Sequence, residues 1–131
     1  MKDFRYSCLI ISSNIKYYSQ VIHTQLKDNN IPFTPFMGCE YISKVGRFRF
    51  ASPQSLKHHL VPYDAYDIIL LAYLNITTEE HIIVQQYLAD ARAHKPDIII
   101  EDFPADPNPL KLALLVSAAR TIHKHVGGGK V

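Results

Sequence analysis

Short, continuous runs of apolar residues alternate along the chain with longer segments in which apolar residues recur every three or four positions. The continuous runs are typical of strands buried on both faces of a sheet, and the spaced positions are typical of helices that cover one. We predict strands at residues 6–12, 31–36, 66–74 and 97–103, and helices beginning after residues 14, 52, 77 and 108. This alternation indicates an α/β fold, a doubly wound three-layer sandwich with a mainly parallel central sheet.

The ends of the predicted helices carry recognisable signals. Thr77 and Glu80 have the spacing of a capping box, and Asn14 and Asn108 stand where N-caps are expected. The three glycines at 127–129 are typical of a helix end. We therefore predict one α/β domain over residues 1–126 and a flexible, glycine-rich tail over residues 127–131.

A β-hairpin is predicted as an insertion over residues 41–50, turning at Gly46. Phe48 and Phe50 fall on one face of this hairpin, with arginines between them on the other. Two prolines within residues 31–36 indicate that this strand is irregular or lies at an edge, because proline has no amide hydrogen for a strand ladder.

The composition is that of an ordinary globular domain. The chain has 131 residues, 47% of them hydrophobic, and a formal net charge of +2, which predicts no general attraction to nucleic acid. Cys8 and Cys39 have no zinc-binding spacing, so we expect reduced, intracellular thiols. The N-terminal apolar run is too short for a signal peptide, and no run is long enough to span a bilayer. These features predict a cytoplasmic protein without membrane contact.

Polar residues follow the predicted strands at the edge where open α/β sheets bind their ligands. The candidate ligand-binding residues are Ser12, Ser13, Asn14, Asn75 and Asp102. The chain has no glycine-rich phosphate-binding motif, and no histidine is placed to activate the serines, for which N-capping is the simpler role. The acidic strand end at Asp102 fits a solvated surface as well as a binding site. We expect no cofactor and no metal, because the histidines lack a chelating spacing.

The hairpin offers a second kind of candidate site. Its basic residues are Lys44, Arg47 and Arg49. With phenylalanines interleaved, they would contact phosphates and stack on bases. Alternatively, the phenylalanines pack on the sheet and the arginines face water.

The last predicted helix has two apolar stripes, although a helix on one face of a sheet needs only one. The first stripe is made of Leu110, Leu114 and Ala118. The second, which we predict as an interface for self-association, is made of Leu112, Leu115, Ala119 and Ile122. A deeper position of the helix in the core is the alternative.

With these elements assigned, the chain resembles the receiver domain of response regulators. "CLIISSNIKYYSQVIHTQL" is similar to the first strand and helix of that family, "YDAYDIILLAYL" to its third strand, and "ARTIHKHVGGGKV" to the end of its last helix. The resemblance implies a doubly wound fold and a role in signalling. The family's acidic pair for magnesium would fall at Ser12 and Ser13, and its phosphorylated aspartate at Ala72. The resemblance therefore implies a degenerate pseudo-receiver that is not phosphorylated.

The sequence leads to three functional hypotheses. The first is a non-catalytic signalling or regulatory module that acts through protein–protein contacts and self-associates through its last helix. The second is a small-molecule or nucleotide-binding domain, or an enzyme, that uses the carboxyl ends of the strands. The third is nucleic-acid contact through the basic hairpin at residues 41–50.

Overall fold

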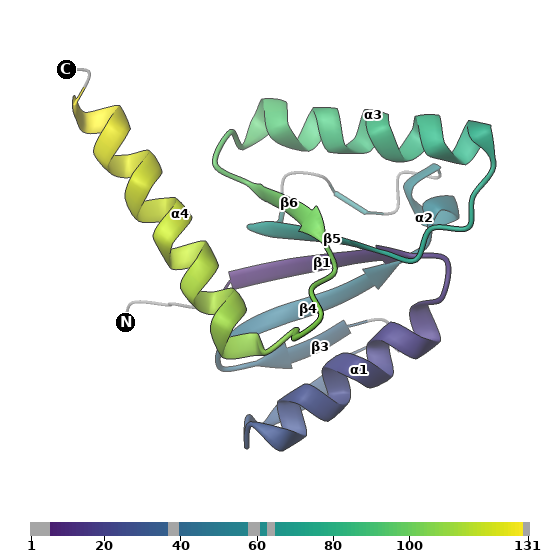
Figure 1. The fold of residues 1–131 in the computed structure, drawn as a ribbon, viewed down its shortest axis with the longest axis horizontal. Coiled ribbons are helices and arrows are strands. Elements are labelled where there is room, and N and C mark those ends of the chain that lie inside the picture. The colour runs from purple at the N-terminus through teal and green to yellow at the C-terminus, as the bar shows by residue number, and fades with distance from the viewer. Residues whose placement is uncertain (1–5, 37–39, 58–60, 63–64, 130–131) are drawn as a thin grey trace.

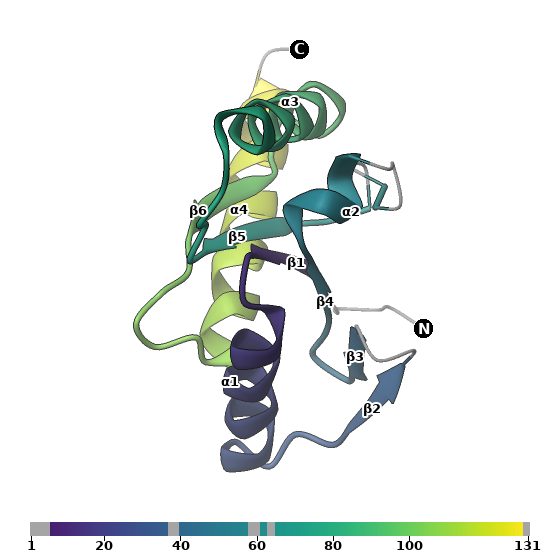
Figure 2. The same cartoon turned by 90° about the vertical axis from the view of Figure 1, so that its right-hand side faces the viewer.

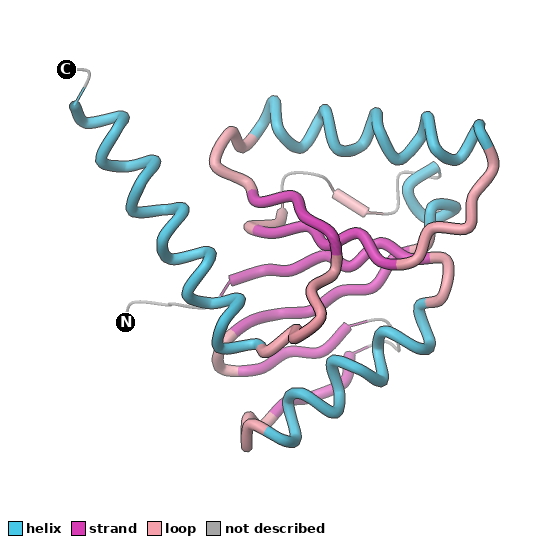
Figure 3. Tube along the Cα trace, in the orientation of Figure 1, coloured by secondary structure: helices cyan, strands magenta, loops and turns pink. Residues whose placement is uncertain are grey.

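The computed structural model describes residues 6–36, 40–57, 61–62 and 65–129; for Phe36 and residues 122–129 it describes the backbone only. Ten elements follow one another along the chain (Figures 1 and 3). They are β1 (Tyr6–Ser12), α1 (Ile15–Asp28), β2 (Phe33–Phe36), β3 (Glu40–Ser43), β4 (Gly46–Ala51), α2 (Pro53–Lys57), β5 (Ile68–Ala72), α3 (Thr78–His94), β6 (Ile99–Asp102) and α4 (Pro109–Gly129).

The strands form one six-stranded mixed sheet in the order β2-β3-β4-β1-β5-β6. β4, β1, β5 and β6 are parallel to one another, whereas β3 runs antiparallel to both of its neighbours, β2 and β4. The prediction of an α/β fold is confirmed, and the antiparallel end makes the sheet mixed.

The predicted hairpin is part of the central sheet and not an insertion. We predicted residues 41–50 as an added hairpin, but its second strand, β4, pairs with β1 in parallel. β2 lies at the edge of the sheet, as the two prolines within residues 31–36 predicted. Pro35 has no amide hydrogen, so β2 cannot serve as a central strand with partners on both sides.

Helices cover the sheet from both faces, as Figure 2 shows. On one face, Ile22 and Leu26 of α1 and Leu112 of α4 pack against the even-numbered residues of β1, such as Cys8 and Ile10. On the other face, α2 and α3 pack against the alternate residues. That second cluster includes Leu9, Ile11, Leu56, Val84 and Leu88. Both faces of β1 are thus buried, as its continuous apolar sequence requires.

Asp67 directly precedes β5 and joins four parts of the fold at that end of the sheet. Its carboxylate accepts a hydrogen bond from the amide of Ser7 at 2.8 Å, and it pairs with Lys95 at 2.8 Å and with Arg120 of α4 at 3.0 Å. Burial by itself would raise the pKa of Asp67, but the hydrogen bonds from Lys95, Ser7 and Arg120 outweigh it and hold the pKa below its ordinary value.

α4 is anchored at its beginning and projects at its end. The buried hydroxyl of Tyr6 donates a hydrogen bond of 2.7 Å to the carbonyl of Pro109. The C-terminal part of the helix, yellow in Figure 1, extends beyond the sheet and the other helices. The helix continues through Gly129 instead of ending before Gly127 as we predicted. Among the described residues, no helix has both the length and the apolar character to cross a membrane.

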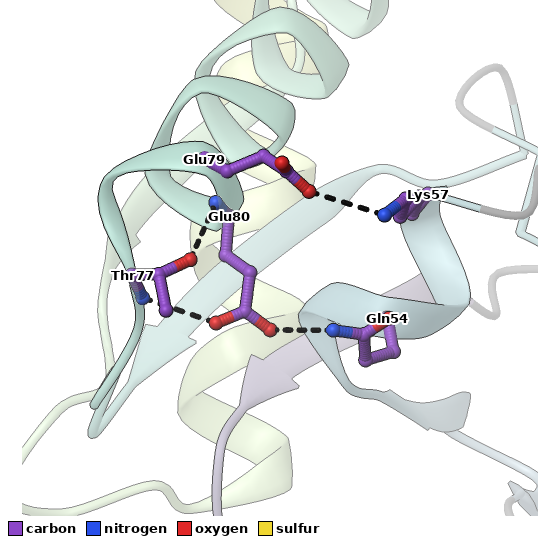
Figure 4. A network of polar contacts seen from close by, with 5 residues as sticks. All are labelled: Gln54, Lys57, Thr77, Glu79 and Glu80. Atoms are coloured by element: carbon purple, nitrogen blue, oxygen red, sulfur yellow. Dashed lines mark hydrogen bonds and ion pairs between the residues drawn. The ribbon is translucent and has the colours of Figure 1, made fainter.

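A polar network joins the beginning of α3 to α2 (Figure 4). The Thr77 hydroxyl accepts the Glu80 amide at 3.1 Å, and the Glu80 carboxylate accepts the Thr77 amide at 3.0 Å, which confirms the capping box. Gln54 of α2 donates to Glu80 at 2.8 Å, and Lys57 pairs with Glu79 at 3.1 Å. The same cap therefore begins α3 and holds α2 beside it.

Replacement of Thr77 by alanine is expected to lower the free energy of unfolding by about 1 kcal/mol, because the Glu80 amide loses its acceptor. Urea denaturation followed by circular dichroism measures this change. The matched control is Thr78→Ala, which removes the neighbouring hydroxyl without touching the cap. Equal stability of the two variants would contradict the capping role of Thr77.

Candidate functional site

The polar residues that follow β1 are engaged with the end of β5. The buried Ser12 hydroxyl donates to the Tyr73 carbonyl at 3.3 Å and accepts the Asn14 amide at 2.9 Å. The Ser13 hydroxyl donates to the Asn75 carbonyl at 3.4 Å and accepts its amide at 3.0 Å. The Asn14 side chain caps α1. These four predicted ligand residues are therefore brought together, but their hydrogen bonds join two strand ends.

The end of β5 has an unusual backbone. Ala72, where the resemblance places a phosphorylated aspartate, is 2% exposed. Tyr73, the next residue, has φ of 27°, in the left-handed region that non-glycine residues rarely occupy. Its carbonyl accepts the amide of Ser13 at 3.0 Å as well as the Ser12 hydroxyl, and its side chain is 59% exposed. The strained backbone conformation of Tyr73 thus coincides with a turn after which its aromatic side chain is exposed to solvent.

A pocket of about 500 Å³ lies at these strand ends, between α1 and the segment that connects β6 to α4. Its lining includes Tyr17, Tyr18, Tyr73, Asp102 and Phe103. Of the predicted ligand residues, only Asp102 lines this pocket. The aromatic residues were not predicted as site residues, although Tyr17 and Tyr18 lie in the first turn of the helix that follows β1, and Phe103 directly follows β6.

Metal-binding clusters are not found in the described part of the chain, where no three His, Cys, Asp or Glu side chains converge. Glu101 and Asp102 are exposed at the end of β6, and Asp106 pairs instead with Lys111 of α4 at 2.6 Å. His58 and His59 lie outside the described residues. The acidic strand end therefore offers one carboxylate to the pocket, without a second acidic group from another strand.

The basic hairpin has its arginines and phenylalanines on opposite faces, as predicted. Phe48 and Phe50 are 0% and 4% exposed and belong to the core on the α1 face. Arg47 pairs with Glu40 at 2.6 Å, and Arg49 hydrogen-bonds to Tyr66. The two phenylalanines are unavailable to stack on bases in this fold. Lys44 is exposed in the turn.

The predicted interface on α4 is corrected by the burial of its residues. Leu112 is 2% exposed and packs against the sheet, so it cannot contact a second subunit in this fold. Leu115 is 44% exposed, Ala119 is half-buried, and the side chain of Ile122 lies outside the described residues. The exposed leucines come from both stripes, since Leu110 is 46% and Leu114 is 71% exposed beside Leu115. Of the four predicted interface residues, Leu112 is therefore the one that the structure excludes.

A second apolar surface lies between α2 and α3. A groove there of about 470 Å³ is lined by Leu56, Val61, Ile82, Ile83 and Tyr87, and Ile82 is 62% exposed. This groove is on the face of the sheet opposite to α4. Ile82 therefore provides an exposed apolar side chain far from the leucines of α4, which is useful for a control variant.

No protein-family model, curated protein or solved structure matches this chain. The function is therefore inferred from the chain's own surfaces. They offer an apolar face on α4 and an aromatic pocket with one carboxylate, whereas the serines that were candidate nucleophiles are engaged in the fold.

Proposed function

We propose that this chain is a non-catalytic α/β regulatory module that associates with a second copy of itself through α4. The observation that carries the proposal is the exposure of three leucines, Leu110, Leu114 and Leu115, within six residues of that helix. A contiguous group of large apolar side chains in water is typical of a contact surface, whereas a single one would need no explanation.

The exposed face of α4 is suited to a copy of itself. Leu110 and Leu114 lie at its beginning, and the exposed residues one to two turns later, such as Ala118 and Thr121, are small. The Thr121 hydroxyl donates to the Ser117 carbonyl at 3.0 Å, so it is already paired within the helix. In an antiparallel pair related by a two-fold axis, the leucines of each copy would pack over the small residues of the other, along about 16 Å of helix.

Charge also favours a second copy over an acidic partner. The cationic residues among the described side chains of α4 are Lys111 and Arg120, and both are paired within the chain, with Asp106 and Asp67. Two such helices would therefore approach with little repulsion. An acidic partner would find these two cations already neutralised.

The strand ends support a module without catalytic activity. Ser12 and Ser13 are committed to backbone hydrogen bonds, and Ala72 has no group that accepts a phosphoryl group. The parallel order β4-β1-β5-β6, with helices on both faces, supports a doubly wound sandwich of the receiver kind, one strand–helix unit short. We thus propose a pseudo-receiver that signals by contact. The free, buried thiol of Cys8 agrees with a cytoplasmic location, which is part of the proposal.

Replacement of Leu114 by glutamate is expected to convert a dimer into a monomer, because each copy would bury an unpaired carboxylate in the interface. Light scattering coupled to size exclusion gives the mass, which for the unmodified chain should be twice the 14.9 kDa of one copy. We expect Leu114→Glu to weaken association at least about tenfold.

The matched control is Ile82→Glu, which places the same charge on the opposite face at a similarly exposed position. It should leave the dimer intact. A monomeric unmodified chain, or a dimer that dissociates with Ile82→Glu and not with Leu114→Glu, would refute self-association through α4.

A further inference from the structure

The pocket at the strand ends is lined by four aromatic residues, together with small or aliphatic residues and one carboxylate. Tyr17 and Tyr18 come from the first turn of α1, Tyr73 from the end of β5, and Phe103 from the end of β6. Its volume of about 500 Å³ lies in the range of small-molecule sites. It also lies where ligands of open α/β sheets bind, beyond the carboxyl ends of parallel strands.

The rings of Tyr17, Tyr18 and Phe103 contact one another edge to face and are not stacked. The centroids of Tyr17 and Tyr18 are 4.9 Å apart with an interplanar angle of 87°, and those of Tyr18 and Phe103 are 4.9 Å apart at 66°. Rings in such edge-to-face contact hold one another in place at the pocket. A ligand in the pocket therefore meets an ordered aromatic surface, and the π-face of each ring carries partial negative charge.

The charge of the pocket has one sign. Asp102 is the charged residue of its lining, and no lysine, arginine or histidine is among the residues that form it. A phosphate or carboxylate ligand would meet aromatic rings and a carboxylate, without a cation among the lining residues to pair with. The hydroxyls of Ser12 and Ser13, two of the predicted ligand residues, already hydrogen-bond to the residues that follow β5. The pocket thus disfavours the nucleotide ligand that the sequence left open.

The backbone at Tyr73 places an aromatic ring at the pocket. A tyrosine with φ of 27° is strained, and the hydrogen bonds from Ser12 and Ser13 to its carbonyl hold it in that conformation. Without this turn, an alternating strand would carry the next side chain to a face of the sheet. With it, the Tyr73 ring lies at the pocket, 59% exposed. Strain maintained in this way is found where a side chain must be positioned.

We propose that this pocket binds a small organic cation, of the quaternary or methylated ammonium class, between the aromatic rings and the Asp102 carboxylate. Ring faces attract such cations, and the methyl groups also bury apolar surface against the rings. The Asp102 carboxylate attracts the positive charge of such a ligand, and a neutral ligand would lack this attraction. This site goes beyond the self-association proposed above, since it lies in one chain and needs no second copy.

The test is a titration with choline, followed by NMR of the backbone amides and tyrosine rings. It uses the Leu114→Glu variant beside the unmodified chain, so that association does not affect the result. We expect saturable shifts centred on Tyr17, Tyr73 and Phe103 in both. The neutral isostere 3,3-dimethylbutan-1-ol, which has the same shape without the charge, should bind at least about tenfold more weakly.

Two variants test separately whether the Asp102 carboxylate and the Tyr73 ring contribute to choline binding. Asp102→Asn should weaken choline binding about tenfold, and Tyr73→Leu at least about fivefold, with the fold retained because both residues are exposed. Asp106→Asn is the matched control, since it removes the same charge from a residue outside the pocket lining, and should leave affinity unchanged.

Three results would each overturn the proposal. The first is equal binding of choline and its neutral isostere. The second is unchanged affinity in Asp102→Asn. The third is an absence of saturable shifts with choline while magnesium–ATP produces them at the same residues, which would assign the pocket to an anionic ligand.

Discussion

Replacement of Phe48 by alanine is expected to lower the free energy of unfolding by about 3–5 kcal/mol, the largest effect of any substitution considered for this chain. Phe48 is fully buried in β4, and its ring meets Tyr6 edge to face at 5.7 Å between centroids. Truncation leaves a cavity beside the central strand that the surrounding residues cannot fill. Urea denaturation at equilibrium measures the change.

This variant also separates two interpretations of the basic hairpin. If Phe48 stacked on nucleic-acid bases, its removal would weaken binding of a single-stranded oligonucleotide and leave stability nearly unchanged. Lys44→Ala is the matched control, because it removes an exposed residue from the same hairpin, and it should alter stability by less than about 0.5 kcal/mol. A Phe48→Ala chain as stable as Lys44→Ala would place Phe48 outside the core.

Replacement of Asp67 by alanine is expected to lower the free energy of unfolding by about 2–3 kcal/mol at neutral pH. The substitution leaves the Ser7 amide without its acceptor and removes the anion that Lys95 and Arg120 share. The matched control is Asp106→Ala. Its carboxylate also pairs with a lysine, Lys111, but on an exposed surface, so the loss should stay below about 1 kcal/mol. Similar losses for the two variants would contradict the importance of burial at Asp67.

The same residue predicts how stability depends on pH. The pKa of Asp67 is lower in the folded chain than in the unfolded one, where it is about 3.9. Its contribution is therefore fully present above the unfolded pKa and is lost as the pH falls through the folded pKa. Urea denaturation of the unmodified chain and of Asp67→Ala at a series of pH values from neutral to acidic should give a difference that shrinks on acidification. A difference that grew would contradict the sign of the shift.

Local signals in the sequence predicted local structure well. The capping box of Thr77 and Glu80 and the N-cap at Asn14 are present at the predicted residues, because each depends on groups three residues apart. The continuous apolar runs of β1 and β5 likewise marked strands that are buried on both faces. In each case the information needed lay within a few residues of the element.

The features that were missed depend on distant parts of the chain. The position of β4 beside β1, where we had predicted an added hairpin, is decided by the pairing of strands some 40 residues apart. On α4, apolar residues occur around most of the helix, so the sequence could not determine which of them face the sheet. Leu112 and Val116 do, because the Tyr6–Pro109 hydrogen bond and the Asp67–Arg120 pair fix the rotation of the helix. The aromatic pocket unites residues from three segments and has no local signature.

The two outermost strands of the sheet have a consequence for aggregation. β2 is four residues long and contains Pro35, so it offers an added strand an incomplete row of amides. At the other edge, β6 is equally short and ends in Glu101 and Asp102, so an abutting copy would bring like charges together. Fibre growth by edge-to-edge strand addition is therefore disfavoured at both sides. Copies of this chain that meet at high concentration are left with helical surfaces, whose two-fold contacts close on themselves and keep an assembly finite.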